Sequence, residues 1–384
     1  MIQRLWWQNR LEELWHKKNV VWLSGVRRVG KTELCRSIPG SRFLDCELPS
    51  TRRELEDPEA FLKSAGEGIL VLDEIHRLGD PALILKIAAD HFPKLRIVAT
   101  GSSTLGASAK FRDSLAGRKA ELMLTPLCEK DEAFPGYADR NRRFLNGGLP
   151  GFFLSETRDD REYSEWMEAF WARDILELFR LERRSSFLKF AELLLAQSGG
   201  RFEASSFAAP CAVSRPTIMN YLSILESTYL VHVIRPYHGA SAAEITSTPL
   251  VYAFDTGFIA WAQGLHEMPA KDRGFFWEHL VLNELMAALQ SRDIGTWRDR
   301  QQREVDFIWA PRGRAPVAIE VKWTAAAFEP RGMRAFRAIH PGSPNIVVAA
   351  DIVEAYTREV GGLKVTWCPI SRLAELVQAA EDQG

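Results

Sequence analysis

The stretch GVRRVGKT, at residues 25–32, decides the fold of this chain. It matches the pattern G-x-x-x-x-G-K-[ST] at every fixed position, and that pattern describes a phosphate-binding loop that follows a strand and opens a helix. The β-branched run VVWLS at 20–24 predicts the strand, and TELCRSI at 32–38 can open the helix. Glycines let the backbone curl so that its N–H groups surround a phosphate, and the helix N-terminus adds a partial positive charge. The sequence therefore predicts a nucleotide-binding α/β domain.

Side chains of this loop have expected tasks. Lys31 can reach the β- and γ-phosphates of a nucleotide, and the Thr32 hydroxyl can ligate magnesium. Arg27 and Arg28 either contact the nucleotide or face solvent. The residues expected to surround the nucleotide are Gly25, Val26, Arg27, Arg28, Val29, Gly30, Lys31, Thr32 and Glu33.

Two further apolar runs end in polar residues. GILVLDEIHRL, which contains Asp73 and Glu74, is typical of a parallel strand buried on both faces. Its carboxylates stand at the sheet edge where α/β folds bind ligands, so Asp73 would hold magnesium and Glu74 would polarise the attacking water as a general base. LRIVATGSS predicts another strand, after which Ser102 or Ser103 either senses the γ-phosphate or caps a turn.

These pieces, in this order, resemble the AAA-type ATPases. They are most similar to a prokaryotic group whose loop reads G-x-R-R-x-G-K-T, whose second motif is D-E-I and whose third strand ends T-G-S-S. That group also carries a leucine-x-glycine-arginine, which here is LAGRK at 115–119. The resemblance implies ATP and Mg²⁺ as ligands, ATP hydrolysis, and a homo-oligomer such as a hexameric ring. It also implies that Arg118 senses or completes the γ-phosphate site, in cis or across a subunit boundary; the alternative is that Arg118 only pairs with a carboxylate.

The segment after the ATPase core is expected to be helical. Aromatic and aliphatic residues at helical spacing in 126–184 suit the lid that closes over an AAA nucleotide, although such a stripe is more often a core face. Residues 185–240 then predict helix, helix, helix and strand, the order of a winged helix-turn-helix.

The third helix of that segment is the one that would contact DNA. It begins after Ser214, an N-cap residue, and Arg215, Thr217 and Asn220 would face outward, where DNA-binding versions present residues to base edges. Between 180 and 238 seven Lys and Arg residues stand against four Asp and Glu. The alternative is a winged helix used for packing or protein contacts.

The sequence EVDFIWAPRGRAPVAIEVKW, at 304–323, predicts two strands joined by a turn. Because strand side chains alternate, Glu320 and Lys322 share one face, and Asp306 stands on the neighbouring strand. An upstream helix offers Glu278 and Glu284. Glu, Asp and Glu-x-Lys on helix, strand and strand resemble the PD-(D/E)xK nuclease fold, although Val305 stands where that motif has proline.

This second resemblance implies a further metal site. Asp306 and Glu320 would bind a second Mg²⁺, Lys322 would position or activate water, and Glu278 would be the helix carboxylate, with Glu284 as runner-up. The prokaryotic ATPase group named above carries a similar C-terminal domain of unknown function. The alternative is a buried ion cluster in a domain that no longer cuts.

The expected fold class is therefore α/β, with four domains. They are the P-loop AAA-type ATPase core at 1–125, the helical lid at 126–184, the winged helix at 185–240 and the PD-(D/E)xK nuclease-like domain at 241–384. The five cysteines form no C-x-x-C, which fits a reducing cytoplasm, and no apolar run approaches the roughly 18 residues that cross a bilayer.

Two functions fit these features. The first is an ATP-hydrolysing motor or switch that acts on DNA, such as branched or junction DNA in repair or recombination, with the C-terminal domain binding or cutting it. A net charge of −1 leaves such attraction to local surfaces, among them 292–341, with ten Lys and Arg against six Asp and Glu. The second is an ATP-dependent regulatory switch whose C-terminal domains bind a protein partner and not DNA.

Overall fold

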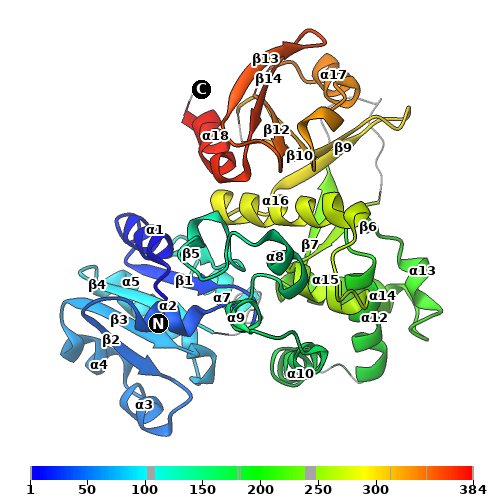
Figure 1. The fold of residues 1–384 in the computed structure, drawn as a ribbon. Coiled ribbons are helices and arrows are strands. Elements are labelled where there is room, and N and C mark those ends of the chain that lie inside the picture. Colours follow the sequence, from blue (N-terminus) through cyan, green and yellow to red (C-terminus); the bar gives the residue numbers. More distant parts are fainter. Residues whose placement is uncertain are drawn as a thin grey trace.

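The structure is a computed structural model that describes residues 2–101, 109–179, 181, 183–237, 248–311, 313–342 and 344–382. Along the chain it passes from a parallel-sheet region, through a helix-rich region, to a second region of strands and helices (Figure 1). The expected α/β fold class is confirmed.

The N-terminal region is built on a parallel sheet with the strand order β2-β3-β4-β1-β5. Its strands are β1 Val20–Ser24, β2 Ser41–Asp45, β3 Gly68–Asp73, β4 Leu95–Thr100 and β5 Lys119–Met123. Side chains of β1 alternate between two cores, with Trp22 on one face and Val21 and Leu23 on the other. The sheet is therefore buried on both faces, which explains its continuous apolar runs.

Helices cover both faces of this sheet. Their bounds are α1 Leu5–Trp15, α2 Lys31–Arg36, α3 Pro49–Glu54, α4 Pro58–Ala65, α5 Pro81–His91 and α7 Ala109–Ser114, with a 3-10 turn η1 at Ile75–Arg77. Helices α1 and α2 contribute to the core that contains Val21, whereas α4, α5 and α7 contribute to the core that contains Trp22.

The helix-rich region follows β5. It begins with η2 Glu129–Asp131, α8 Arg140–Asn146, α9 Pro150–Leu154 and α10 Asp160–Phe170, which runs through a π-helical turn η3, Trp171–Ile175, into α11, Leu176–Phe179. It continues with α12 Arg184–Ala196, β6 Gly200–Arg201, α13 Ala204–Ala208, α14 Arg215–Ser227, β7 Val231–Pro236, β8 Leu250–Ala253 and α15 Thr256–Ala262. The three helices and the strand predicted for 185–240 are present as α12, α13, α14 and β7.

The C-terminal region starts with η4 Ala270–Asp272 and the long helix α16 Arg273–Leu289. The elements after α16 are β9 Ile294–Arg298, β10 Glu304–Trp309, β11 Val317–Lys322, η5 Ala325–Ala327, α17 Arg331–Ile339, β12 Asn345–Ala349, β13 Tyr356–Val360, β14 Leu363–Cys368 and α18 Ile370–Asp382. Strands β10 and β11 pair antiparallel, as the sequence predicts, with Phe307 opposite Ile319.

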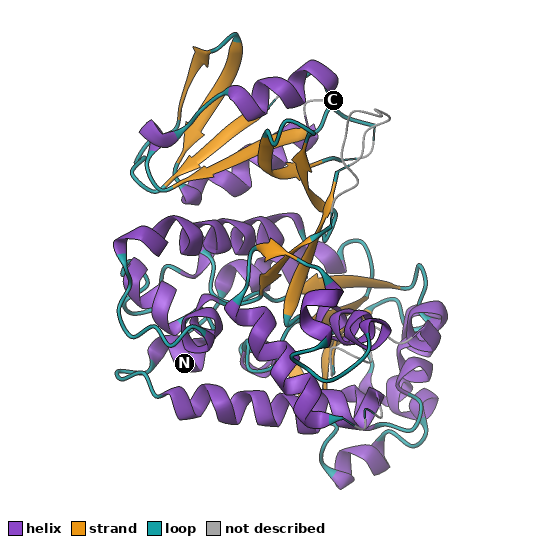
Figure 2. Ribbon diagram, turned by 90° about the vertical axis from the view of Figure 1, so that its right-hand side faces the viewer, coloured by secondary structure: helices purple, strands orange, loops and turns teal. Residues whose placement is uncertain are grey.

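One sheet joins the middle and the C-terminal regions. Its order is β13-β14-β12-β11-β10-β9-β7-β8-β6, and its strands continue from the helix-rich region into the C-terminal region (Figure 2). The link is a parallel pairing of β7 with β9, Arg235 opposite Gly295. The expected boundary at 240 therefore does not separate two structural units, because β8, beyond it, pairs with β7 and β6. The sequence carries no local signal for this pairing, because residues 237–249 separate β7 from β8.

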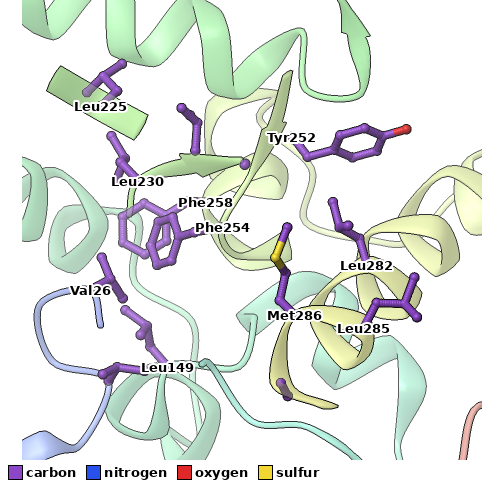
Figure 3. Packing of buried hydrophobic residues seen from close by; sticks show 14 of the residues in the cluster. Val26, Leu149, Leu225, Leu230, Tyr252, Phe254, Phe258, Leu282, Leu285 and Met286 are labelled. Atoms are coloured by element: carbon purple, nitrogen blue, oxygen red, sulfur yellow. The ribbon is translucent and has the colours of Figure 1, made fainter. Parts of the chain in front are cut away.

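A shared hydrophobic core holds these regions together. Figure 3 shows Phe254 and Phe258 between Leu230 of the middle region and Val26 of the phosphate loop. The same cluster includes Met286 and other buried residues of α16. No helix within the described residues is long and apolar enough to span a bilayer.

Candidate nucleotide site and the C-terminal ion cluster

The phosphate loop curls between β1 and α2 through two glycines with positive φ. Gly25 has a φ of 136° and Gly30 a φ of 102°. A Cβ atom on Gly25 would lie 2.4 Å from the carbonyl oxygen of Leu124, so that position has no room for a side chain. The loop conformation therefore depends on glycine, and it leads into the first N–H groups of α2, which have no partner within the helix.

Lys31 lies folded over its own loop. Its Nζ atom donates hydrogen bonds to the carbonyl oxygens of Gly25, at 2.8 Å, and Val26, at 3.1 Å. Burial lowers the pKa of Lys31, while the charges of Glu74 and Asp174 oppose that shift. A phosphate that enters the loop offers the ammonium group charged partners in place of these neutral ones.

Thr32 and Asp73 form the pair expected to hold magnesium. The Thr32 hydroxyl donates to Oδ2 of Asp73 at 2.9 Å, and the Thr100 hydroxyl donates to Oδ1 of the same carboxylate. Burial raises the pKa of Asp73, and these two hydrogen bonds partly offset the rise. A hydroxyl and a carboxylate side by side at the mouth of the loop fit a hard cation that prefers oxygen ligands.

Glu74 is held beside them in a conformation that is rare for a residue with a side chain. Its φ is 54°, its N–H donates to the Thr100 hydroxyl at 3.1 Å, and its Oε2 lies 3.1 Å from Nδ1 of His76. Burial alone would raise the pKa of Glu74, but the hydrogen bond from His76 and the positive charges around it outweigh burial and lower that pKa. Glu74 is therefore poised as an ionised carboxylate, as a general base requires.

These residues line one pocket of about 390 Å³. Its lining includes all but two of the residues expected to surround the nucleotide, because Val26 and Val29 are buried in the core. The pocket is also lined by residues that the sequence did not assign to it: Glu47, His76, Arg77, Gly101, Pro150, Gly151, Arg173 and Asp174.

The charged members of this set include two pairs. His76 and Arg77 directly follow the D-E-I motif, whereas Arg173 and Asp174 belong to the π-helical turn of the lid. The only sequence signal for the second pair is a charged Arg-Asp inside an otherwise apolar helical stripe. The expected lid thus contributes side chains to the nucleotide pocket.

Arg118 lies at the other end of the sheet. Strands β1 and β5 run parallel with Val20 opposite Lys119, so Arg118 stands beside the start of β1, roughly 13 Å along the strand from the loop that follows its end. Its Nε donates to Asp90 at 2.8 Å. The expected role in cis is therefore wrong, and the carboxylate pairing is what the structure contains. Ser102 and Ser103 lie outside the described residues.

The outward face of α14 agrees in part with expectation. Arg215 and Asn220 are exposed. Thr217 is half-buried, its N–H is capped by the Ser214 hydroxyl at 3.3 Å, and its hydroxyl is 2.9 Å from that of Ser214. Met219, which is 49% exposed, stands on this face instead. Thr217 is thus part of the helix cap.

Asp306, Glu320 and Lys322 do come together. Lys322 Nζ donates to Glu320 at 2.6 Å and to Asp306 at 3.2 Å, and Asp306 also accepts from the N–H of Val321 at 2.7 Å. Burial raises the pKa of Glu320 to about 8. Lys322 thus stands between the two carboxylates as a cation.

Glu278 lies near this cluster, in a pocket of about 300 Å³ shared with Asp306, Tyr252, Arg201 and Arg298. It accepts a hydrogen bond from the Tyr252 hydroxyl, and burial raises its pKa to about 7. Across the described part of the chain, no group of three or more His, Cys, Asp or Glu side chains is placed to hold a metal ion. Asp306 and Glu320 are paired with Lys322 here, an arrangement that fits the alternative of a buried ion cluster, and the second magnesium site stays a prediction.

Glu284, the alternative candidate for the helix carboxylate, lies away from the ion cluster and binds the segment after β5. Its Oε2 accepts from the backbone N–H of Glu129 at 2.9 Å, and it is fully buried near Arg143. The neighbouring Asn283 donates to the carbonyl of Leu127 at 3.1 Å. These residues of α16 fix the segment that follows β5, so Glu284 is a structural contact and not part of the ion cluster.

Family models match successive parts of the chain. An AAA domain matches residues 17–131, and two domains of unknown function, DUF8612 and DUF4143, match residues 137–268 and 273–366. The last boundary, near 270, agrees with the pairing of β8 with β7 and not with a division at 240.

Three proteins from bacteria are similar to this chain over most of its length. Uncharacterized proteins of Mycobacterium bovis and Mycobacterium tuberculosis are each 29% identical over 338 residues, which covers 85% of this chain and 75% of theirs. An uncharacterized protein of Haemophilus influenzae is 24% identical over 366 residues, covering 86% of this chain and 87% of its own.

Among solved structures, the Walker-type ATPase PABY2304 of Pyrococcus abyssi is similar at 18% identity and a TM-score of 0.44, covering 68% of this chain and 96% of its own. The AAA match and the geometry of the loop, of Thr32 and of the Asp73-Glu74 pair lead to the same result. The chain carries an AAA-type P-loop ATPase domain, followed by further α/β structure.

Proposed function

We propose that this protein hydrolyses ATP with Mg²⁺ and uses the energy to act on DNA. The observation that carries the first half is the convergence of Lys31, Thr32 and Glu74 on one pocket, with Asp73 bound to the Thr32 hydroxyl. In this proposal Lys31 binds the β- and γ-phosphates, and Thr32 and Asp73 hold the metal ion, which neutralises phosphate charge when bound. Glu74 takes the proton of the attacking water.

The proposal that the partner is DNA is based on surfaces outside the nucleotide site. Arg215 and Asn220 are exposed on a helix whose order in the chain matches a winged helix-turn-helix. Arg201 and Arg298 line the polar pocket between β6 and β10, near the ion cluster. Such cations suit the phosphates of a DNA strand. Cleavage is not part of this proposal, because the pairing of Lys322 with Asp306 and Glu320 also fits a buried ion cluster in a domain that does not cut.

An ATP-dependent switch that binds a protein is the second candidate. Met219, half exposed in the middle of the outward face of α14, favours it, because an apolar side chain there suits a protein surface better than base edges. In this case the exposed residues of α14 would not contact DNA, and the ATPase chemistry would stay the same.

An ATPase assay on the full chain separates the candidates. We expect ATP turnover that rises when single-stranded, duplex or four-way-junction DNA is added, with one form most effective. Turnover that ignores every DNA form would favour the protein-binding switch. No turnover, together with no ATP binding, would contradict the ATPase proposal itself.

A homo-oligomer remains part of the proposal. Arg118 sits far from the nucleotide pocket of its own chain, and at 35% side-chain exposure it is accessible to a neighbouring subunit. An Arg118 that completes the γ-phosphate site of a neighbour would have to leave Asp90. Mixing Arg118→Ala with Lys31→Ala chains would then restore some turnover, whereas unchanged turnover in Arg118→Ala alone leaves Arg118 as the surface partner of Asp90.

A further inference from the structure

Asp174 is a buried acid inside a pocket built for phosphate. It lies in the π-helical turn between α10 and α11, and the residue is 8% exposed. The turn is anchored on both sides of it, by Trp171, which packs on Phe187, and by Ile175, which is fully buried. π-Helical turns re-aim side chains and occur often at functional sites. The lid therefore holds this carboxylate in the nucleotide pocket.

The partner of Asp174 is Arg27 of the phosphate loop. Nη1 of Arg27 lies 3.8 Å from Oδ2 of Asp174, which is an ion pair but too long for a hydrogen bond. Oδ2 of Asp174 and Nε of Arg27 are both buried, and neither accepts or donates a hydrogen bond within the described residues. Both ends of the pair thus keep hydrogen-bonding capacity for another partner.

A triphosphate would change this balance. A guanidinium binds phosphate oxygens through short, bidentate, charge-assisted hydrogen bonds, which are stronger than a long contact to one carboxylate oxygen. The γ-phosphate also places negative charge near Asp174, and like charges repel in a pocket of low dielectric constant. The phosphate and Asp174 therefore compete for one arginine.

We infer that Asp174 is a positioning residue that holds Arg27 away from the phosphate site until a γ-phosphate takes it. The lid then distinguishes ATP from ADP, because only ATP breaks the contact between Asp174 and the loop. This inference rests on the proposed ATP-binding function. It adds that the pair of Arg27 and Asp174 makes the position of the lid depend on the γ-phosphate.

The test compares affinities for a non-hydrolysable ATP analogue and for ADP, both with Mg²⁺, by calorimetry on the full chain. In Asp174→Asn the freed Arg27 should raise the preference for the triphosphate by roughly fivefold, the effect of losing one partly screened ion pair. In Arg27→Ala that preference should fall, and adding Asp174→Asn to it should change nothing further. A merely structural role for Asp174 would move both nucleotides equally.

The control is Glu165→Gln, which removes the same charge from the exposed side of α10 and should leave the preference unchanged. If Arg27→Ala binds neither nucleotide, Arg27→Gln becomes the background, since glutamine removes the charge that pairs with Asp174 but keeps a polar side chain. A preference that stays at the wild-type value in Asp174→Asn, or that still changes when Arg27 is absent, overturns the inference. A wild-type chain that binds neither nucleotide overturns the ATPase proposal instead.

Discussion

Neighbouring carboxylates in the nucleotide pocket have opposite environments. Asp73 accepts hydrogen bonds from two threonine hydroxyls and has a raised pKa because it is buried, whereas Glu74 stands among cations that lower its pKa. Groups whose environments differ in this way usually have different tasks. This difference is what the proposed function requires, with Asp73 neutralised by a metal ion and Glu74 ionised so that it can accept a proton.

Glu74→Gln should separate binding from turnover. The amide keeps the size of the side chain but cannot accept the proton of the attacking water, so ATP should still bind while turnover falls at least about a hundredfold. Nucleotide binding and phosphate release, measured on the same preparation, check this. Lys31→Ala is the contrasting variant, in which binding itself should weaken. Wild-type turnover in Glu74→Gln would refute the assignment of the base.

Glu284 makes stability depend on pH. Burial raises its pKa to about 7, while an unfolded glutamate titrates near 4.3, so between these values the folded chain holds more protons than the unfolded chain. Its contribution is therefore most favourable below about pH 4 and is lost as pH rises to about 7, a change on the order of 3 kcal/mol.

Glu284→Gln should remove that part of the pH dependence. Glutamine keeps an oxygen to accept from the N–H of Glu129 and has no proton to lose. Melting temperatures across this window should therefore show the variant gaining on the wild type as pH rises. The exposed Glu267→Gln should run parallel to the wild type. A constant difference between Glu284→Gln and wild type would contradict the buried, raised pKa.

At the scale of elements, α14 presents one exposed cation on the face expected to contact DNA. Arg215→Ala should weaken binding to all DNA sequences and reduce the slope of log affinity against log salt by about one, if Arg215 contacts a phosphate. Salt titrations with labelled duplex measure this. Arg53→Ala, an exposed arginine on α3, is the control and should leave the slope unchanged. Equal slopes for Arg215→Ala and wild type would favour the protein-binding candidate.

Helix α16 contacts both the polar pocket beside Asp306 and the segment that follows the ATPase sheet. Its Glu278 points into the polar pocket beside Asp306, and its Asn283 and Glu284 bind the backbone of the segment that follows β5. Gln290, at its end, accepts from the N–H of Met123 at 2.7 Å and donates to the carbonyl of Met123 at 3.1 Å. In Figure 1 the helix lies between the ATPase region and the C-terminal strands. One helix therefore connects the end of β5 with the pocket that contains Glu278.

The elements of the ATPase core were predictable because their signals are local. β1, the loop and α2 follow from eight residues and the runs beside them, and β3 and β4 follow from apolar stretches that end in polar residues. The pairing of Asp174 with Arg27 was not predictable, because it joins residues far apart in the chain through a tertiary approach. Arg118 was misplaced for the same reason: a motif gives the order of residues but not the end of the sheet at which each one lies.

At the scale of the whole molecule, the prediction about DNA cleavage concerns the ion cluster of Asp306, Glu320 and Lys322. With Lys322 between Asp306 and Glu320, we expect the wild-type protein to show no nicking of any DNA form with Mg²⁺ or Mn²⁺. Asp306→Ala should lower the melting temperature, because it removes one of the two carboxylate partners of Lys322 and the acceptor of the Val321 N–H, at a cost of roughly 1–3 kcal/mol.

The exposed Glu354→Ala is the control for that variant and should melt with the wild type. Metal-dependent nicking by the wild type, abolished in an Asp306→Ala variant of unchanged melting temperature, would instead identify a working nuclease site.

The pairing of β7 with β9, which joins the two parts of the large sheet, is short. Within the described residues the two strands share the pairs Arg235 with Gly295 and Pro236 with Thr296, and proline has no N–H to donate. Hydrogen bonds across this line are therefore few, although the sheet is continuous on both sides of it. Between the middle and C-terminal regions, the strands therefore contribute fewer ladder contacts than the four pairs that join β7 with β8, and the shared hydrophobic core bears more of any load between the regions.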